Sequence, residues 1–540
     1  MRRIFVSAAA ALLAACSASA QSSRPPAQAC GGLSHLELSK AKVLSAQIVE
    51  PGAFTPPSTG TPWLIGSPEL YKSVGAFCRV VVHSAPSADS DIKIEVWLPA
   101  EAWNGSFLGQ GNGGFAGEID YRRLALAVQK KYASAATNTG HSAGGTDGRW
   151  ALSHPEKVID FGYRGIHEMT EIAKTVIDTF YGSKQRHSYF SNCSNGGRQG
   201  LMEAQRFPAD YDGILAGAPA NFWTHLLTKA LADAQATTLD PASYIPASKL
   251  PTIARAVNAA CDAQDGVTDG VLNDPRQCKF DPASLLCKAN DSNECLTAPQ
   301  VATLKKLYEG PRDAKGNLIF PGYVPGAEEG PGGWGLWITG LEPGKSLLFA
   351  FATGYFSNFV YEKADWNYRE TTVEQGLKAA EEKTSKILNA TDPNLAAFNA
   401  RGGKLILYHG WNDAAISALN TINYYNDVTA TMGEAQTNAF TRLYMVPGLQ
   451  HCGGGPGANS FGQDGAGAND PQRNMELALE QWVEKGIAPS SIVATKYAED
   501  NPTKGVKLTR PLCPYPQVAK YKGAGDTNDA ANFVCAPGSK

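Results

Sequence analysis

The chain has 540 residues, of which 43% are hydrophobic and 18% charged, and its formal net charge is -3. This length can bury a large core, either in one large domain with an insertion or in several domains. The nearly balanced charge and the lack of a Lys/Arg-rich run argue against nucleic acid or an anionic membrane surface as a partner.

The first residues have the parts of an export signal. Met1-Arg2-Arg3 is basic, residues 4–15 are apolar and Ala18-Ser19-Ala20 fits a cleavage site, so residues 1–20 are predicted to be a signal peptide. Leu13-Ala14-Ala15-Cys16 also resembles a bacterial lipoprotein box, with Cys16 as the lipid anchor. No later stretch is long and apolar enough to span a bilayer. We expect a secreted or periplasmic protein, with an outer-membrane lipoprotein as the alternative.

Eleven cysteines are consistent with export, because disulfides persist in oxidising compartments. Without Cys16 ten remain, and an even number favours a disulfide framework. Sequence proximity suggests four pairs, namely Cys30–Cys78, Cys261–Cys278, Cys287–Cys295 and Cys513–Cys535. Cys193 and Cys452 are then left for each other, although counting alone also allows these two to be free or paired differently.

Residues 21–75 look irregular, and from residue 78 short apolar strands alternate with helical stretches. We expect strands at residues 79–83, 92–98, 106–109, 188–191 and 212–217, and a helix at 163–181. The alternation stops after residue 220 and resumes with strands at 404–408 and 442–446, followed by a helix at 475–485. Such alternation is typical of a largely parallel sheet. The interrupting segment, rich in Gly, Pro and aromatic residues, is interpreted as an inserted lid.

Ser194 follows a short predicted strand and precedes Gly196-Gly197 and a helical run. This is the setting of a nucleophile elbow, in which small residues allow a strained turn that projects the hydroxyl from the end of the sheet. The usual G-x-S-x-G pattern is altered here, because Asn192 replaces the first glycine. A serine near two glycines is by itself a weak signal, since loop serines are common.

Two further residues extend this pattern. Asp413 comes shortly after the strand expected at 404–408, and His451 comes shortly after the strand expected at 442–446. The chain order Ser…Asp…His is that of α/β-hydrolases. A histidine can take the serine proton near neutral pH, and an aspartate can orient the imidazole. Each residue alone has an ordinary explanation as a turn or loop residue, but together they predict a catalytic triad.

A triad of this kind also needs two backbone N–H donors for the oxyanion. Asn195, directly after the nucleophile, is predicted to supply one. The segment Gly111-Asn112-Gly113-Gly114 is predicted to supply the other, through Gly113 or Gly114. A Gly-rich loop can also cradle phosphate, but no GK[ST] or G-x-G-x-x-G pattern accompanies this one.

Several motifs together resemble the tannase and feruloyl esterase family over essentially the whole mature chain. They are Gly111–Gly117, Asp160–Arg164, Cys193–Gly200, Gly217–Ala220, Gly410–Asp413 and Pro447–Gly457. The resemblance implies an α/β-hydrolase with a large inserted lid domain, a disulfide between Cys193 and Cys452, and ester hydrolysis through an acyl-enzyme. The hydrolase domain is predicted to comprise residues 21–220 and 392–540, and the lid residues 221–391.

The predicted lid contains aromatic side chains that could stack on an aromatic acyl group, namely Trp223, Trp334, Trp337, Tyr355, Phe356 and Phe359. The alternative is that they form the core of the lid. In the terephthalate hydrolase of this family a lid arginine holds the free carboxylate. No arginine occurs here between Arg312 and Arg369, which weakens a terephthalate interpretation.

Residues 262–271 place three carboxylates close together, with glycines that permit sharp turns. Hard oxygen ligands at this density suit Ca²⁺, although the spacing lacks the terminal bidentate glutamate of an EF-hand. The family resemblance implies a structural Ca²⁺ in the lid, held by the side chains of Asp262, Asp265 and Asp269 and the carbonyls of Val267 and Val271. The alternative is a solvated acidic turn. No His/Cys cluster suits a catalytic zinc.

We therefore predict a secreted serine carboxylic-ester hydrolase that acts on small aromatic acid esters of the feruloyl, hydroxycinnamoyl or galloyl type. The alternative within the same family is a hydrolase of the terephthalate monoester mono(2-hydroxyethyl) terephthalate. More remote alternatives are a noncatalytic binding protein on a hydrolase scaffold, and thiol chemistry with Cys193 as nucleophile or redox centre.

Overall fold

The computed structural model describes residues 25–58, 61 and 64–538. The predicted signal peptide and the alternative lipid anchor at Cys16 lie outside the described residues. Among the helices of the described part, none combines the length and apolarity that a bilayer crossing requires.

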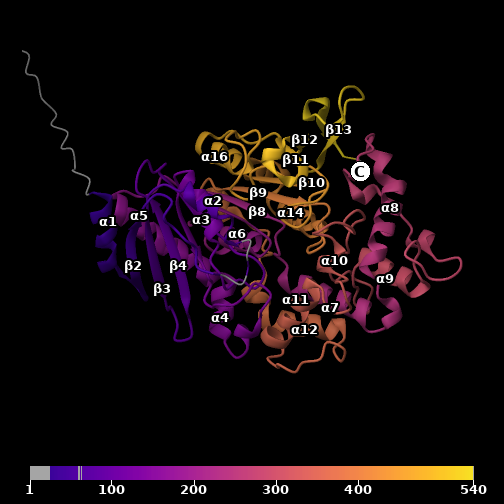
Figure 1. Cartoon of the computed structure of the whole chain (residues 1–540). Coiled ribbons are helices and arrows are strands. Elements are labelled where there is room, and N and C mark those ends of the chain that lie inside the picture. Colours follow the sequence, from indigo (N-terminus) through magenta and orange to yellow (C-terminus); the bar gives the residue numbers. More distant parts are fainter. Residues whose placement is uncertain (1–24, 59–60, 62–63, 539–540) are drawn as a thin grey trace, which may run out of the picture.

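A ten-stranded sheet organises the fold, in the order β1-β2-β3-β4-β6-β5-β7-β8-β9-β10 (Figure 1). The strands are β1 (Glu37–Leu38), β2 (Ala41–Val49), β3 (Phe77–Ser84), β4 (Ile92–Pro99), β5 (Ser106–Gln110), β6 (Ala133–Thr137), β7 (His187–Cys193), β8 (Gly213–Gly217), β9 (Lys404–Gly410) and β10 (Thr441–Val446).

The sheet is mixed rather than largely parallel. The pairs from β6 through β10 are parallel, whereas those from β1 to β6 are antiparallel. Antiparallel neighbours need only a short turn between them, while parallel neighbours need a long crossover. The expected parallel arrangement therefore applies to the half of the sheet whose strands are separated by helices.

Alternate side chains of the parallel strands face two layers of helices. Phe107, Phe190 and Ile214 pack on one face with helices α5 (Gly165–Tyr181), α6 (Asn195–Arg206) and α14 (Ala418–Met432). Leu108, Tyr189 and Leu215 pack on the other face with α3 (Tyr121–Gln129) and α16 (Met475–Lys485). Burial on both faces explains why these strands are short runs of apolar residues.

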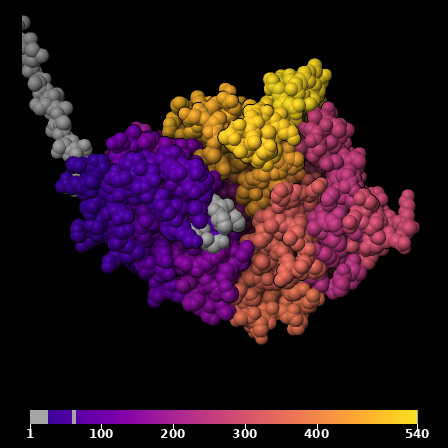
Figure 2. Space-filling view, in the orientation of Figure 1, coloured from indigo at the N-terminus to yellow at the C-terminus, as the bar shows by residue number. Residues whose placement is uncertain are grey.

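The segment between β8 and β9, described throughout, contributes no strand to this sheet. Its helices are α7 (Trp223–Thr238), α8 (Leu250–Cys261), α9 (Ala298–Glu309), α10 (Trp334–Trp337), α11 (Leu347–Tyr355), α12 (Val373–Leu388) and α13 (Ala396–Ala400). Most of them pack around an aromatic core that Phe115 and Phe161 also enter from the preceding part of the chain, whereas Phe398 of α13 belongs to the core of the sheet. The Ala390 N–H donates to the Asn221 carbonyl at 2.8 Å, so the two ends of this lid lie side by side. In the space-filling view the lid, magenta to orange, fills the right-hand part of the molecule (Figure 2).

Some strands were not expected from the sequence. β2 is half exposed along its length, so it lacks a clear apolar alternation. Two hairpins follow the last expected strand, formed by β11 (Ile492–Tyr497) with β12 (Val506–Leu512) and by β13 (Gln517–Tyr521) with β14 (Phe533–Pro537). These short strands lie outside the large sheet, and β12, β13 and β14 each expose one or more side chains, which again blurs the pattern.

The expected disulfide framework is confirmed, with bonds at Cys30–Cys78, Cys193–Cys452, Cys261–Cys278, Cys287–Cys295 and Cys513–Cys535. The first joins α1 (Pro26–Gly32) to β3, the third and fourth lie within the lid, and the last links the two C-terminal hairpins.

The close packing of α6 on the sheet gives a first prediction. A methyl group at Gly197 would come within 2.3 Å of the Gly217 carbonyl oxygen, a backbone atom that cannot move aside alone. Gly197→Ala should therefore lower the free energy of unfolding by about 1–3 kcal/mol, measured by denaturant unfolding. Gly31→Ala is the control, because a methyl group on α1 would meet nothing within 4 Å. Equal stability of the two variants would contradict this account.

Candidate active site

Ser194 occupies the sharp turn between β7 and α6. Its φ of 66° and ψ of -125° lie in a region that residues other than glycine rarely adopt. Gly196 allows this turn, since a methyl group there would come within 2.4 Å of the Asn192 Cβ. Asn192 in turn accepts a hydrogen bond from the Cys193 N–H at 2.7 Å. The altered elbow motif is therefore built around the side chain of Asn192.

The other two predicted triad residues lie beside Ser194. The His451 Nε2 atom is 2.9 Å from the Ser194 Oγ atom, and the His451 Nδ1 atom is 2.7 Å from an Asp413 carboxylate oxygen. Asp413 follows β9 and His451 follows β10, and parallel strands end at the same edge of a sheet. The parallel pairing of β9 with β10 therefore brings Asp413 and His451 together, although they are distant in the sequence.

Asp413 is fully buried, and its surroundings favour the ionised form. Its Oδ1 atom accepts the N–H groups of Ala415 at 2.8 Å and Ile416 at 2.9 Å. Burial would raise the pKa of Asp413, but the charge of His451 and hydrogen bonds from His409 and His451 lower it below its usual value. A carboxylate that stays charged in this position can hold the Nδ1–H of His451 and stabilise an imidazolium.

The Cys193–Cys452 disulfide joins the residues that adjoin Ser194 and His451. It places their Cα atoms 5.9 Å apart across a sequence separation of 259 residues. Thiol chemistry at Cys193 requires a thiolate, which a disulfide does not offer. The thiol alternative is therefore set aside.

The two predicted sources of oxyanion donors are tied together. The N–H of Asn195 begins α6 and has no intrahelical partner. Asn112 is fixed to α6, because its N–H donates to the Gln199 Oε1 atom at 3.0 Å. Its Oδ1 atom accepts from the side-chain amides of Gln199 at 2.7 Å and Asn195 at 3.2 Å. Gln199 lies within the Cys193–Gly200 motif, but the sequence analysis gave it no role of its own.

The two glycines of this loop differ in their surroundings. A methyl group at Gly113 would meet nothing within 4 Å, so Gly113 borders open space. Gly114 has a φ of 55° and lies against the Gly145 carbonyl, which a methyl group there would approach to 2.3 Å.

The lid aromatics separate into two groups. The Trp337 ring lies edge-on to the His451 ring, with centroids 4.9 Å apart, and stacks near Phe351. Trp223, Trp334 and Phe356, together with Tyr355 and Phe359, are buried in the lid core. Of the six aromatic residues proposed to stack on the substrate, Trp337 has a ring contact with a triad residue, and the other five occupy core positions as the alternative expects.

The lid is also hydrogen-bonded to both catalytic loops. Gln450, next to His451, accepts from the Gly332 N–H at 3.1 Å and donates to the Glu329 carbonyl at 2.9 Å. Asn412, next to Asp413, donates to the Gly326 carbonyl. These contacts hold residues 326–332 of the lid against the site.

The residues expected to bind Ca²⁺ form a compact turn after α8. Asp265, Val267, Asp269 and Val271 line a cavity of about 20 Å³. The Asp262 carboxylate accepts the Gly270 N–H, and Asp269 pairs with Arg510 at 2.7 Å. Burial raises the pKa of Asp265 to about 6 and that of Asp269 above its usual value. Arg510 thus pairs with Asp269, whereas the Asp262 and Asp265 carboxylates accept backbone N–H groups. Carboxylate and carbonyl oxygens are the ligand type that Ca²⁺ prefers.

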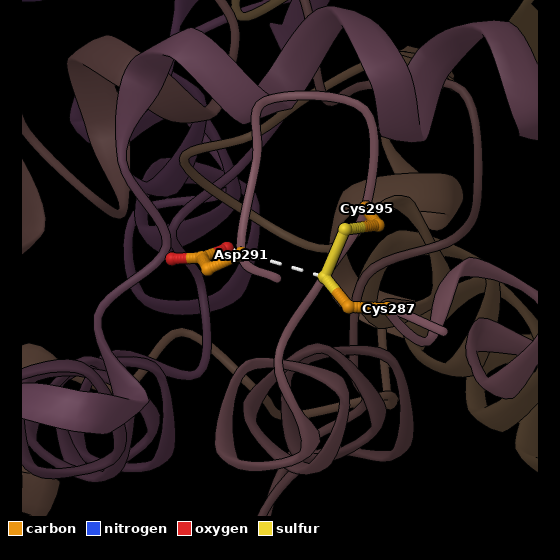
Figure 3. A group of neighbouring side chains, drawn as sticks. All are labelled: Cys287, Asp291 and Cys295. Atoms are coloured by element: carbon orange, nitrogen blue, oxygen red, sulfur yellow. Dashed lines mark hydrogen bonds between the residues drawn. A yellow bond between two sulfur atoms is a disulfide. The ribbon is translucent and has the colours of Figure 1, made fainter. Parts of the chain in front are cut away.

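Among the described residues, two groups of side chains have the spacing of metal ligands, and the three aspartates of the turn after α8 are not one of them. Cys287 and Cys295 lie near Asp291, but their sulfur atoms are bonded to each other and provide no thiolate (Figure 3). His167, Glu203 and Asp210 lie toward the end of α6 opposite Ser194, where His167 bonds Asp210 at 2.6 Å and Lys174 lies 3.8 Å from it. Burial raises the pKa of Glu203 well above its usual value, so this group is charge-balanced without an ion.

The fold and the site define an α/β-hydrolase, with a serine at a strained turn, a histidine and an aspartate at the ends of parallel strands. A family model described as Tannase and feruloyl esterase matches residues 78–536. The chain belongs to the tannase and feruloyl esterase family and is a carboxylic ester hydrolase. The noncatalytic alternative is therefore not supported.

Relatives cover almost the whole chain. An uncharacterized esterase of Xanthomonas campestris pv. campestris is 41% identical over 97% of this chain and 92% of its own length. A probable feruloyl esterase B-2 of Aspergillus flavus is 34% identical over 81% of this chain and 83% of its own. The crystal structure of feruloyl esterase B from Aspergillus oryzae has a TM-score of 0.86 at 29% identity, covering 95% of this chain and 100% of that one.

The disulfide beside the triad gives a second prediction. The double variant Cys193→Ser/Cys452→Ser should lose about 2–5 kcal/mol of stability, and roughly 100-fold in kcat/KM if the catalytic loops separate by about 1 Å. Ester hydrolysis and thermal unfolding measure both effects. Cys287→Ser/Cys295→Ser is the matched control, because that pair is partly exposed, spans 8 residues and lies within the lid. Native kcat/KM in the first variant would disprove the positioning role.

Proposed function

We propose that this protein is a secreted serine esterase that hydrolyses aromatic acid esters of the feruloyl, hydroxycinnamoyl or galloyl type. The observation that carries the proposal is the continuous chain of contacts from Ser194 through His451 to Asp413, at 2.9 and 2.7 Å. These distances are those of a nucleophile bonded to its base and of a base bonded to its orienting carboxylate.

In the first half of the reaction the Ser194 Oγ atom attacks the ester carbonyl carbon and its proton passes to the His451 Nε2 atom. The tetrahedral intermediate then breaks its bond to the alcohol, which leaves with the proton from His451. Asp413 keeps the imidazole in the tautomer whose Nε2 can accept a proton. An acyl-enzyme on Ser194 and a free alcohol result.

In the second half a water molecule takes the place of the alcohol. His451 removes its proton, the resulting hydroxide attacks the acyl carbon, and collapse of the intermediate returns the proton to Ser194 and releases the acid. The N–H groups of Asn195 and Gly113 would stabilise both oxyanions. Gly113 is the better candidate of the two loop glycines, because it borders open space whereas Gly114 packs against Gly145.

Two observations support an aromatic acyl group. Trp337 presents a large ring beside His451, and an aromatic acid can stack on such a surface. Relatives over most of the chain are named probable feruloyl esterases. Secretion is supported by the export signal and by the five disulfides, which fit an oxidising compartment.

Substitution of the nucleophile tests the mechanism. Ser194→Ala should reduce kcat on methyl ferulate at least roughly 1,000-fold while the melting temperature stays near that of the parent. Ser188→Ala, on the same strand, is the control for a buried serine and should stay active. Turnover by Ser194→Ala equal to the parent's would remove Ser194 from the mechanism.

A substrate panel tests the specificity. The parent enzyme should favour methyl ferulate, methyl gallate or chlorogenate over mono(2-hydroxyethyl) terephthalate and over an aliphatic butyrate ester, judged by kcat/KM. Preference for the terephthalate ester would support the alternative within the family, and preference for butyrate would reject an aromatic specificity.

We also propose that Asp262, Asp265 and Asp269, with the carbonyls of Val267 and Val271, hold a structural Ca²⁺. The cation would offset the mutual repulsion of the three carboxylates, of which Asp269 pairs with Arg510. The turn lies against the loop that carries His451, since Pro447 lines the same small cavity. Bound Ca²⁺ would therefore stabilise the lid and that loop, without taking part in the chemistry.

This site predicts a metal-dependent stability. Ca²⁺ at a hundredfold excess over its Kd should add about 2.7 kcal/mol to the free energy of unfolding, seen as a higher melting temperature than in EDTA. Asp265→Asn should abolish this increase, whereas Asp281→Asn, at an exposed aspartate, should keep it. If Ca²⁺ raised the melting temperatures of the parent and of Asp265→Asn equally, the cation would be acting at another site.

A further inference from the structure

We infer that His409 is a positioning residue of the triad, which holds the Asp413 carboxylate in place through a second imidazole. This inference rests on the proposed roles of Ser194, His451 and Asp413. His409 lies near the end of β9, is fully buried and directly precedes the Gly410–Asp413 motif.

The contacts of His409 converge on the catalytic carboxylate. Its Nε2 atom is 3.2 Å from the Asp413 Oδ2 atom, the same oxygen that lies 2.7 Å from the His451 Nδ1 atom. Neither His409 nor Asp413 exposes its side chain. Solvent therefore does not compete for this contact, and a hydrogen bond to an ionised group is among the stronger ones.

The other neighbours of His409 identify its tautomer. The Nε2 atom is also 3.1 Å from the Ile416 carbonyl oxygen, which can only accept, so Nε2 carries a hydrogen. The Nδ1 atom is 2.7 Å from the Thr421 hydroxyl, which can donate to it. The Nε2–H group of His409 thus donates to the Ile416 carbonyl oxygen, and the Asp413 Oδ2 atom lies 3.2 Å from the same nitrogen.

With these contacts, both carboxylate oxygens of Asp413 have two neighbouring polar groups. Two backbone N–H groups bond Oδ1, and two imidazoles meet at Oδ2. The carboxylate can then neither rotate nor move toward the lid when His451 becomes charged. His409 does not border the nucleophile, so it acts on the reaction through Asp413 alone.

The charged and titratable neighbours of this group are few. Besides the two histidines, Tyr323 from the lid and Tyr408 from β9 sense the charge of Asp413. Burial raises the pKa of both tyrosines, which therefore stay neutral. A change in the pH profile after substitution of His409 can accordingly be attributed to the histidines and Asp413.

A matched pair of substitutions tests the inference. His409→Phe keeps a ring of similar volume but removes the N–H, and should lower kcat/KM on methyl ferulate roughly 10- to 100-fold with little change in KM. The acid limb of its pH–rate profile should move to higher pH, because more of the carboxylate charge is left to stabilise the His451 imidazolium. His409→Gln restores an N–H at a similar reach, and should recover most of the activity and the parent's profile.

Two further variants keep the result interpretable. Thr421→Val leaves His409 in place but removes the hydroxyl that fixes its tautomer, and should cause a smaller loss in the same direction. Ser194→Ala tests the triad itself, so turnover there would refute the proposed function and not specifically the role of His409.

The inference is overturned by any of three results. One is parent-like kcat and pH dependence in folded His409→Phe. Another is equal inactivity of His409→Gln and His409→Phe at the parent's melting temperature, which would assign His409 a packing role. The third result is needed if His409→Phe does not fold. In that case, folded Thr421→Val with the kinetics of the parent overturns the inference.

Discussion

The bond between Cys193 and Cys452 is the constraint on which the site depends. It connects the turn after β7 to the loop after β10, at opposite sides of β8 and β9 in the sheet. The hydroxyl of Ser194 and the imidazole of His451 each lie one residue from a bonded sulfur, so neither loop can drift from the other. Without this disulfide, hydrogen bonds alone would have to hold the glycine-rich loop after β10 in place. Ordering such a loop is costly in conformational entropy.

The remaining supports of the site come from three directions. From the hydrolase core, α6 fixes the oxyanion loop through Asn112 and Gln199. From the lid, residues 326–332 bond Asn412 and Gln450, so the lid braces the acid and base loops from outside. From β9, His409 contacts the carboxylate of Asp413. Each catalytic residue is thereby set by neighbours on different elements, which is how rigid sites maintain reactive geometry.

Much of the fold and of the site could be predicted because its signals are local. The nucleophile turn, the strand ends before Asp413 and His451, and the glycines near Ser194 are readable within a few residues. Two contacts were not foreseen. Asn112 and Gln199 are 87 residues apart. His409 and Asp413 are close in the sequence, but their contact depends on how the chain turns after β9. Trp334 and Trp337 lie in one short helix, yet one fills the lid core and the other touches His451. No local pattern separates them, because the direction each ring takes depends on how the lid packs.

The sequence by itself indicated the class of chemistry, the chain order of the predicted triad residues, four of the cysteine pairs and the presence of an insertion. Those features follow from residue types and from their spacing along the chain. Counting left the Cys193–Cys452 pair open, because its members are 259 residues apart. Only the tertiary structure decided that pair, which strands run antiparallel, which aromatic ring lies beside His451 and which histidine lies beside Asp413. These depend on the packing of elements far apart in the chain, where many side-chain directions satisfy the same pattern but only one satisfies the burial and hydrogen bonds of the whole.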